Sequence, residues 1–166
     1  MKKQFIFILL PFFIASASSQ STNEFKVNAV LDSWHKAAAE ADFNAYFNAM
    51  TDDALFIGTD AKENWNKTAF MAYAKPHFDK GKAWSFSMIE RHIYFNSNHT
   101  LVWFDELLNT QMKICRGSGV LVLQKGKWKI QHYVLSMTIP NDVSDEVVKI
   151  KTPIEDLLIT ILENKK

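Results

Sequence analysis

The second half of the chain alternates between apolar and polar residues with a period of two, which is typical of β-strands. Four such stretches, at 84–95, 101–110, 114–123 and 128–137, are separated only by short turns. Gaps of this size favour hairpins between consecutive strands. The pattern therefore predicts one continuous antiparallel sheet in this half of the chain.

The first half has apolar residues three and four positions apart, which is the spacing of amphipathic helices. It predicts helices at 25–41 and 66–75, and a shorter one between them that begins after Asp42 as its N-cap. A brief strand is expected at 54–58. Helices that cap a curved antiparallel sheet of this kind make a cone-like α+β fold.

A last helix is predicted at about 153–163. Thr152 and Glu155 have the spacing of a capping box, and Pro153 suits the first helical position. We therefore divide the chain into a leader at 1–20, one folded domain at 24–141 and a C-terminal extension at 142–166 that carries this extra helix.

The leader has the layout of a secretory signal peptide. Lys2 and Lys3 precede an apolar run at 5–14, and small residues follow up to Ala17. A run of this length is too short to span a bilayer, which needs about 20 residues. The sequence predicts a periplasmic or secreted protein with no membrane span after cleavage near Ala17 or Gln20, and a retained interfacial anchor is the alternative.

Charge and cysteine content exclude some classes of protein. Loss of Lys2 and Lys3 would leave 17 of the 19 basic residues against 18 acidic ones, so no basic surface for nucleic acid is expected. The single cysteine, Cys115, cannot form an intramolecular disulfide and suits a buried or interface thiol better than a nucleophile.

Register can be argued from the turns. If Thr110 pairs with Lys113, and Gln124 with Trp128, the polar residues of the sheet fall on one face. That face would carry Trp103, Asp105, Arg116, Ser118, Ile130, His132, Val134 and Ser136. We expect it to line a pocket beneath the helices.

Several motifs, taken in this order, resemble the SnoaL-like branch of the nuclear transport factor 2-like superfamily. They are Trp65…Phe70…Tyr73…Pro76-His77-Phe78, Trp103-Phe104-Asp105, Arg116-Gly117-Ser118-Gly119-Val120 and the closing Trp128-x-Ile130-x-His132-x-x-x-Ser136. The resemblance covers residues 24–141. It implies a cone-shaped cavity, frequent homodimers and very mixed functions, which include isomerases, cyclases, dehydratases and non-catalytic binding or assembly domains.

Asp105 and His132 are the candidate catalytic residues, because a carboxylate and an imidazole together can move protons. His132 also resembles the recurrent histidine of the family's last strand. The register puts their Cα atoms roughly 12 Å apart, so a ligand or water would have to lie between them. The alternatives are a structural pairing of Asp105 with Arg116 or Arg91, and a structural role for His132.

Candidate ligand-binding residues are mainly aromatic. They are Trp34, Tyr46, Trp65, Tyr73, Trp103, Arg116 and Ser136, with Trp65 and Tyr73 expected at the mouth of the pocket. Arg116 needs an anion, either a ligand carboxylate or a neighbouring acid. No cofactor and no metal are expected, since the histidines lack ligand spacing and Val134 stands where many relatives have a second histidine.

The opposite face of the sheet is also apolar, and something must cover it. It carries Phe104, Leu108, Leu121, Leu123, Tyr133 and Leu135. The cover is either the C-terminal helix or a second subunit, and we favour a homodimer through this outer face. Three functions stay open: a binding protein for a small apolar or amphipathic molecule, an isomerase, cyclase or dehydratase, and a non-catalytic dimerisation module.

Overall fold

The computed structural model describes residues 15–165, which form two units. The first ends at Ser136 and contains a six-stranded sheet with the helices α1, α2 and α3. The second begins at Met137 and contains α4. The α+β class predicted from the sequence is confirmed.

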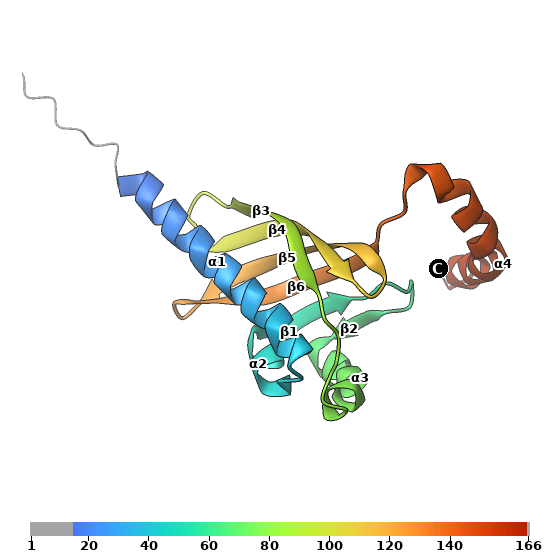
Figure 1. Cartoon of the computed structure of the whole chain (residues 1–166), viewed down its shortest axis with the longest axis horizontal. Helices are drawn as coiled ribbons and strands as arrows, with labels where there is room; N and C mark the ends of the chain where they lie inside the picture. Colours follow the sequence, from blue (N-terminus) through green and yellow to red (C-terminus); the bar gives the residue numbers. More distant parts are fainter. Residues whose placement is uncertain (1–14, 166) are drawn as a thin grey trace, which may run out of the picture. The chain divides into compact units, whose positions relative to one another are not determined.

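The helices of the first unit are α1 (Ala15–Ala39), α2 (Phe43–Asn48) and α3 (Lys67–Asp79). Asp42 is the N-cap of α2, as predicted, and its carboxylate accepts a hydrogen bond of 2.9 Å from the Ala45 amide. Asn66 caps α3 in the same way. The long α1 runs across the sheet, and α2 and α3 pack beside β1 (Figure 1).

The strands are β1 (Met50–Ile57), β2 (Asn64–Asn66), β3 (Ser87–Phe95), β4 (Leu101–Thr110), β5 (Lys113–Gln124) and β6 (Lys127–Met137). Their order in the sheet is β2-β1-β6-β5-β4-β3. The pairing of β3 with β4 and of β4 with β5 is antiparallel, and Asp105 lies opposite Ser118 as predicted. The short β1 is the exception, because it runs parallel to β6.

The alternation of faces along β6 changes phase in the middle of the strand. Trp128 and Ile130 are buried, but the next buried residues are Tyr133 and Leu135, three and five positions beyond Ile130. The pairing of β6 with β1 is irregular at the same place. The prediction that His132 shares a face with Trp128 and Ile130 is therefore wrong, because one extra residue in a strand moves every later side chain to the other face.

The helices cover the opposite face of the sheet from the one predicted. Val27, Leu31 and Trp34 of α1 are buried together with Phe104 and the other even-numbered apolar residues of β4. Burial of the largest apolar area decides which face a helix covers, and the row with Phe104, Leu108, Leu121, Tyr133 and Leu135 offers far more of it. The face predicted to receive a second subunit is thus the core of the domain.

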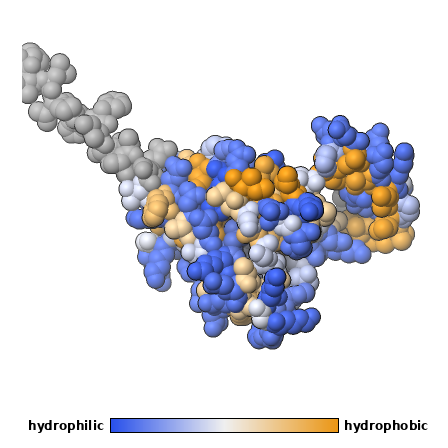
Figure 2. Space-filling view, viewed as in Figure 1, coloured by the Kyte–Doolittle hydropathy of each residue, from blue (hydrophilic) through white to orange (hydrophobic). Residues whose placement is uncertain are grey.

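In the second unit, α4 spans Ser144–Glu163 and follows a short 3₁₀ turn, Asn141–Val143. The predicted start near Pro153 is wrong, because this proline lies inside the helix. The Thr152 hydroxyl donates a hydrogen bond of 2.7 Å to the Val148 carbonyl one turn back and does not cap a helix start. Exposed apolar residues gather on the surface of α4 (Figure 2), among them Ile150, Ile154 and Leu157.

The predicted signal peptide falls mainly on residues 1–14, which lie outside the described residues. α1 continues without a break past the predicted cleavage positions Ala17 and Gln20. Among the described side chains of α1, the first buried one is Val27. Within residues 15–165 no helix is both long and apolar enough to cross a bilayer.

Gly117 of β5 tests how tightly the side chains on the buried face of the sheet are packed. It pairs with Glu106, and a Cβ atom there would overlap the Tyr133 hydroxyl and lie 3.0 Å from Glu106 Cγ. We expect Gly117→Ala to lower the free energy of unfolding by about 1–3 kcal/mol in urea denaturation, because both neighbours are buried and must move. Ser118→Ala, on the other face of the same strand, should change it by less than about 0.5 kcal/mol.

Candidate functional site

A cavity of about 240 Å³ opens at one end of the first unit. We call it the aromatic cavity, since six of its lining residues carry aromatic rings that are not imidazoles: Phe56, Trp65, Phe70, Tyr73, Trp84 and Phe86. The other lining residues are Gly58, Thr59, Glu63, His77, Ala83, Gln111, Met112 and Leu135. The wall thus combines β1, β2 and the loop between them with α3, the segment after α3, the turn between β4 and β5, and Leu135 of β6.

The rings along the β2 and α3 side of the aromatic cavity stack on one another. The Trp65 ring stacks on the Tyr73 ring at 4.5 Å between centroids and lies parallel to the Phe70 ring at 5.7 Å. Phe70 in turn stacks on Phe56 at 4.0 Å. These contacts make this side of the cavity a continuous wall of stacked rings.

Glu63 and His77 are the ionisable lining residues other than Tyr73. The Glu63 carboxylate lies against Gly58, where a Cβ atom would collide with it. It accepts a hydrogen bond of 3.2 Å from the Asp60 amide. The His77 ring lies 5.4 Å from the Tyr73 ring on the next turn of α3. These groups give an apolar cavity a small polar edge.

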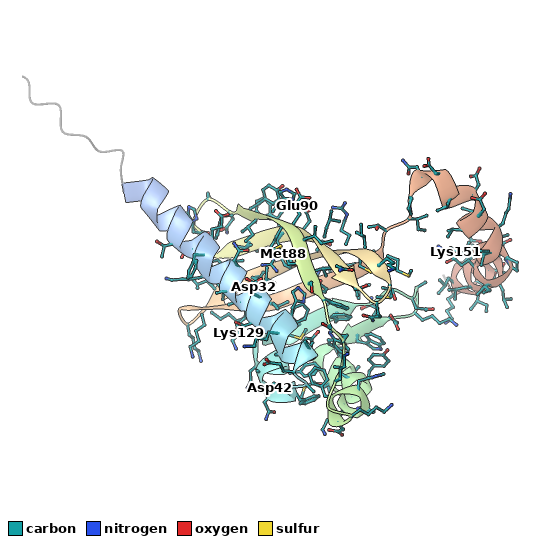
Figure 3. The ribbon with its side chains drawn as sticks, in the orientation of Figure 1. Asp32, Asp42, Met88, Glu90, Lys129 and Lys151 are labelled. Carbon is teal, nitrogen blue, oxygen red and sulfur yellow. The ribbon has the colours of Figure 1, made fainter. Side chains whose placement is uncertain are left out.

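A buried polar cluster lies between α1 and the sheet, and we call it the Glu106 cluster. Glu106 of β4 is 0% exposed and receives hydrogen bonds from His35 Nε2 at 2.8 Å and the Tyr133 hydroxyl at 3.0 Å. Its other oxygen lies 2.9 Å from Arg91 Nε and 2.7 Å from Nη2. Asp32, labelled on α1 in Figure 3, accepts from Arg91 Nη1 at 2.8 Å.

The pKa values of the Glu106 cluster follow from these contacts. Burial by itself would raise the pKa of the Glu106 carboxyl, but the hydrogen bond from His35 and the charges of His35 and Arg91 hold it below its usual value. Burial raises the pKa of Tyr133 well above its usual range, and the adjacent Glu106 carboxylate raises it further. The cluster therefore holds an ionised glutamate and a neutral tyrosine at neutral pH.

The Glu106 cluster lies behind the wall of the aromatic cavity and does not line it. The His35 ring is 6.0 Å from the Phe86 ring, and the Tyr133 ring is 5.7 Å from the Phe56 ring. Phe86 and Phe56 both line the cavity. The cluster is thus one layer of rings away from the cavity, where it supports the wall and touches no ligand.

The polar residues predicted to line the pocket are on the outer face of the sheet. Asp105 lies 3.4 Å from Arg116 Nη1 and 3.2 Å from His92 Nδ1, so its pairing with Arg116 matches the structural alternative. His132 pairs with Leu55, whose side chain is exposed, and so faces the same way. The placement of Asp105 and His132 inside a pocket is wrong, because that pocket was assigned to the uncovered face.

The aromatic candidates divide into three groups. Trp65 and Tyr73 line the aromatic cavity, and Tyr73 is 45% exposed, as expected for a residue at its mouth. Trp34 and Tyr46 are buried in the core, with their rings stacked at 4.8 Å. Trp103, together with Arg116 and Ser136, is exposed on the outer face of the sheet.

Two sets of residues escaped the sequence analysis. The polar residues of α1 in and around the Glu106 cluster, Asn28, Asp32 and His35, are four and three positions apart, which places them on one side of the helix. Glu106 itself was visible as a charge in the apolar row of Phe104 and Leu108. Glu63 gave no signal, because it lies in a loop with no periodic pattern.

Comparison with known proteins gives the family. The family model of the SnoaL-like domain matches residues 27–140. No curated protein shows significant sequence similarity to the chain. The chain belongs to the SnoaL-like domain family, which is part of the NTF2-like superfamily, and the resemblance seen in the sequence is confirmed.

Solved structures support the same fold. A protein of unknown function from Mycobacterium tuberculosis is 12% identical, with a TM-score of 0.64 over 80% of this chain and 82% of that one. A proposed NTF2-like dehydratase from Streptomyces avermitilis is 10% identical, with a TM-score of 0.63 over 73% and 99%. A proposed scytalone dehydratase from Novosphingobium aromaticivorans is 9% identical, with a TM-score of 0.62 over 74% and 89%. At these identities the comparison shows the fold alone.

No metal site accompanies the aromatic cavity in the part of the chain that the structure describes. Across residues 15–165, no three His, Cys, Asp or Glu side chains are grouped so that they could hold an ion. The site is an aromatic cavity whose lining also includes the polar residues Thr59, Glu63, His77 and Gln111.

The Glu106 cluster predicts how stability depends on pH. Glu106→Gln should lower the free energy of unfolding by about 3 kcal/mol at pH 7, because the buried Arg91 guanidinium loses the carboxylate that it pairs with. Since the folded pKa of Glu106 lies below its ordinary 4.5, its contribution is present above pH 4.5 and is lost as the pH falls through the folded value. The free energy of unfolding of wild type, measured by urea denaturation, should therefore fall as the pH is lowered below 4.5. That of the variant should fall much less over the same range.

The matched control for this experiment is Glu90→Gln, an exposed carboxylate on β3 (Figure 3). Its effect should stay within about 0.5 kcal/mol. Equal effects of the two substitutions at pH 7 would contradict the assignment of Glu106 as the charge that joins α1 to the sheet.

Proposed function

We propose that this protein binds a small apolar or amphipathic molecule in the aromatic cavity and does not convert it. The observation that carries the proposal is the composition of the wall, which joins six aromatic rings with a few polar groups at one edge. Ligand sites in proteins typically have this combination of an apolar wall and a small number of orienting polar groups.

The absence of the sequence-based catalytic pair from the aromatic cavity favours binding over turnover. Asp105 and His132, the sequence-based candidates for acid–base chemistry, do not line the aromatic cavity. Glu106 and His35 are close to each other but are sealed behind Phe86 and Phe56. Two of the structural neighbours are proposed dehydratases, so an enzyme remains the alternative to be tested beside binding.

Substitution of Trp65 tests the binding site, with indole as a neutral aromatic probe. Indole should bind wild type in isothermal titration calorimetry, and Trp65→Ala should weaken binding by about tenfold, because the wall loses one of its stacked rings. Phe25→Ala is the control, since Phe25 of α1 is 74% exposed and does not line the cavity.

Three results bear on this proposal. Native mass spectrometry of the purified protein should show a co-purified small molecule in wild type and less of it in Trp65→Ala. Failure of wild type to bind indole at millimolar concentration would overturn the proposal. Conversion of a co-purified molecule into a product by wild type would favour the enzyme instead.

A second candidate function, self-association, has its own observation. The outer face of the sheet carries exposed Tyr94, Trp103 and Ile114, and the Tyr94 and Trp103 rings stack at 6.0 Å. Half-buried Val120 and Val134 continue this surface toward β6. Surfaces of this kind on a sheet commonly pack on another protein surface. We therefore propose a homodimer through this face, opposite to the face predicted from the sequence.

The dimer is tested by Val120→Lys, which places a charge in the middle of the proposed interface. Light scattering after size-exclusion chromatography should report a dimer for wild type and a monomer for the variant, with self-association weakened by about 100-fold. Lys82→Ala, an exposed change in the segment after α3, should leave the dimer intact. A monomeric wild type at high micromolar concentration would contradict this candidate.

A further inference from the structure

We infer that the ligand of the aromatic cavity is a small organic cation, an ammonium group on a short apolar body, with Glu63 as its counter-charge. This inference rests on the proposed binding function and names the class of ligand. Three features of the cavity carry it: the sign of its charge, the environment of Glu63 and the number of aromatic rings.

The sign of the charge comes from the lining residues. Glu63 is the carboxylate among them. The lining contains no lysine and no arginine. An anionic ligand would therefore meet a carboxylate with no compensating cation, whereas a cationic ligand would meet a favourable field.

The Glu63 carboxylate is held in place but is not neutralised. It is half-buried, it rests against Gly58, and it accepts a hydrogen bond of 3.2 Å from the Asp60 amide. In the described part of the chain, no Lys, Arg or His side chain forms an ion pair with it. A neutral ligand that closed the cavity would remove water from this carboxylate without replacing the lost interaction, which is costly. A cation would replace it.

The aromatic rings of the cavity attract the ammonium group of the ligand in addition to Glu63. A cation within about 6 Å of an aromatic centroid is attracted by the negative face of the ring, and Trp gives the strongest attraction. Trp65 and Trp84 both line the cavity, and Tyr73 stacks on Trp65 at its mouth. A quaternary or tertiary ammonium has the right character for such a wall, because its charge is spread over apolar methyl groups. The cavity volume of about 240 Å³ limits the ligand to a small body.

Two probes of nearly equal shape distinguish the effect of ligand charge on binding from the effect of ligand shape. Phenyltrimethylammonium is a cation, and tert-butylbenzene is its neutral carbon analogue. Binding of each to the full chain is measured by competition against indole, followed by ligand-observed NMR. We expect wild type to bind the cation about tenfold more tightly than the neutral analogue.

Glu63→Gln should reduce this preference to about threefold or less, because the amide keeps the shape of the side chain but not its charge. Glu40→Gln is the matched control, since Glu40 is an exposed carboxylate just after α1 that does not line the cavity. It should leave the preference unchanged. Thermal unfolding of both variants checks that they fold.

The outcomes separate this inference from the proposed function. If wild type binds both probes equally, or binds the neutral one more tightly, the cavity binds ligands and the inference about charge is overturned. If Glu63→Gln keeps the full preference for the cation, the assignment of Glu63 is overturned. If neither probe nor indole binds, both the inference and the proposed function fail. Should Glu63→Gln not fold, the wild-type ratio of the two affinities still decides about charge.

Discussion

A buried carboxylate on β4, next to the edge strand β3, constrains the rest of the first unit. Glu106 has no contact with solvent, and an isolated charge in such a place would be very costly. Arg91 from the neighbouring strand, His35 from α1 and Tyr133 from β6 offset that cost with a hydrogen bond or ion pair each. Because these partners come from three elements, the charge is satisfied only when α1 lies in one position on the sheet.

That position has consequences for the aromatic cavity. His35 and Tyr133 lie directly behind Phe86 and Phe56, so the polar cluster and the cavity share one layer of rings. A cluster in which the polar groups are paired is rigid, and it makes the wall in front of it rigid too. The molecule thus separates two uses of carboxylates: Glu106 is fully paired and structural, while Glu63 at the cavity is held in position without a counter-charge.

Much of the sheet could be predicted from local sequence. The hairpin of β4 and β5 follows from a two-residue turn, and the pairs of Asp105 with Ser118 and Leu107 with Arg116 follow from it by counting. The same counting failed in β6, because one extra residue between Ile130 and Tyr133 reverses the faces and no turn signal marks it. The start of α4 was missed because proline favours the first turn of a helix and disfavours its interior, whereas Pro153 lies inside α4.

The sequence by itself determined the class of fold, the order and pairing of the hairpin strands, the family and an aromatic wall that includes Trp65 and Tyr73. These features depend on periodicity, turns and motifs, which are local properties of the chain. Only the tertiary structure decided which face of the sheet the helices cover, and with it that Glu106 is internal while Asp105 and Arg116 face outward. Alternation divides a strand into two faces but does not rank them, because the ranking depends on the apolar area that distant helices can bury against each one.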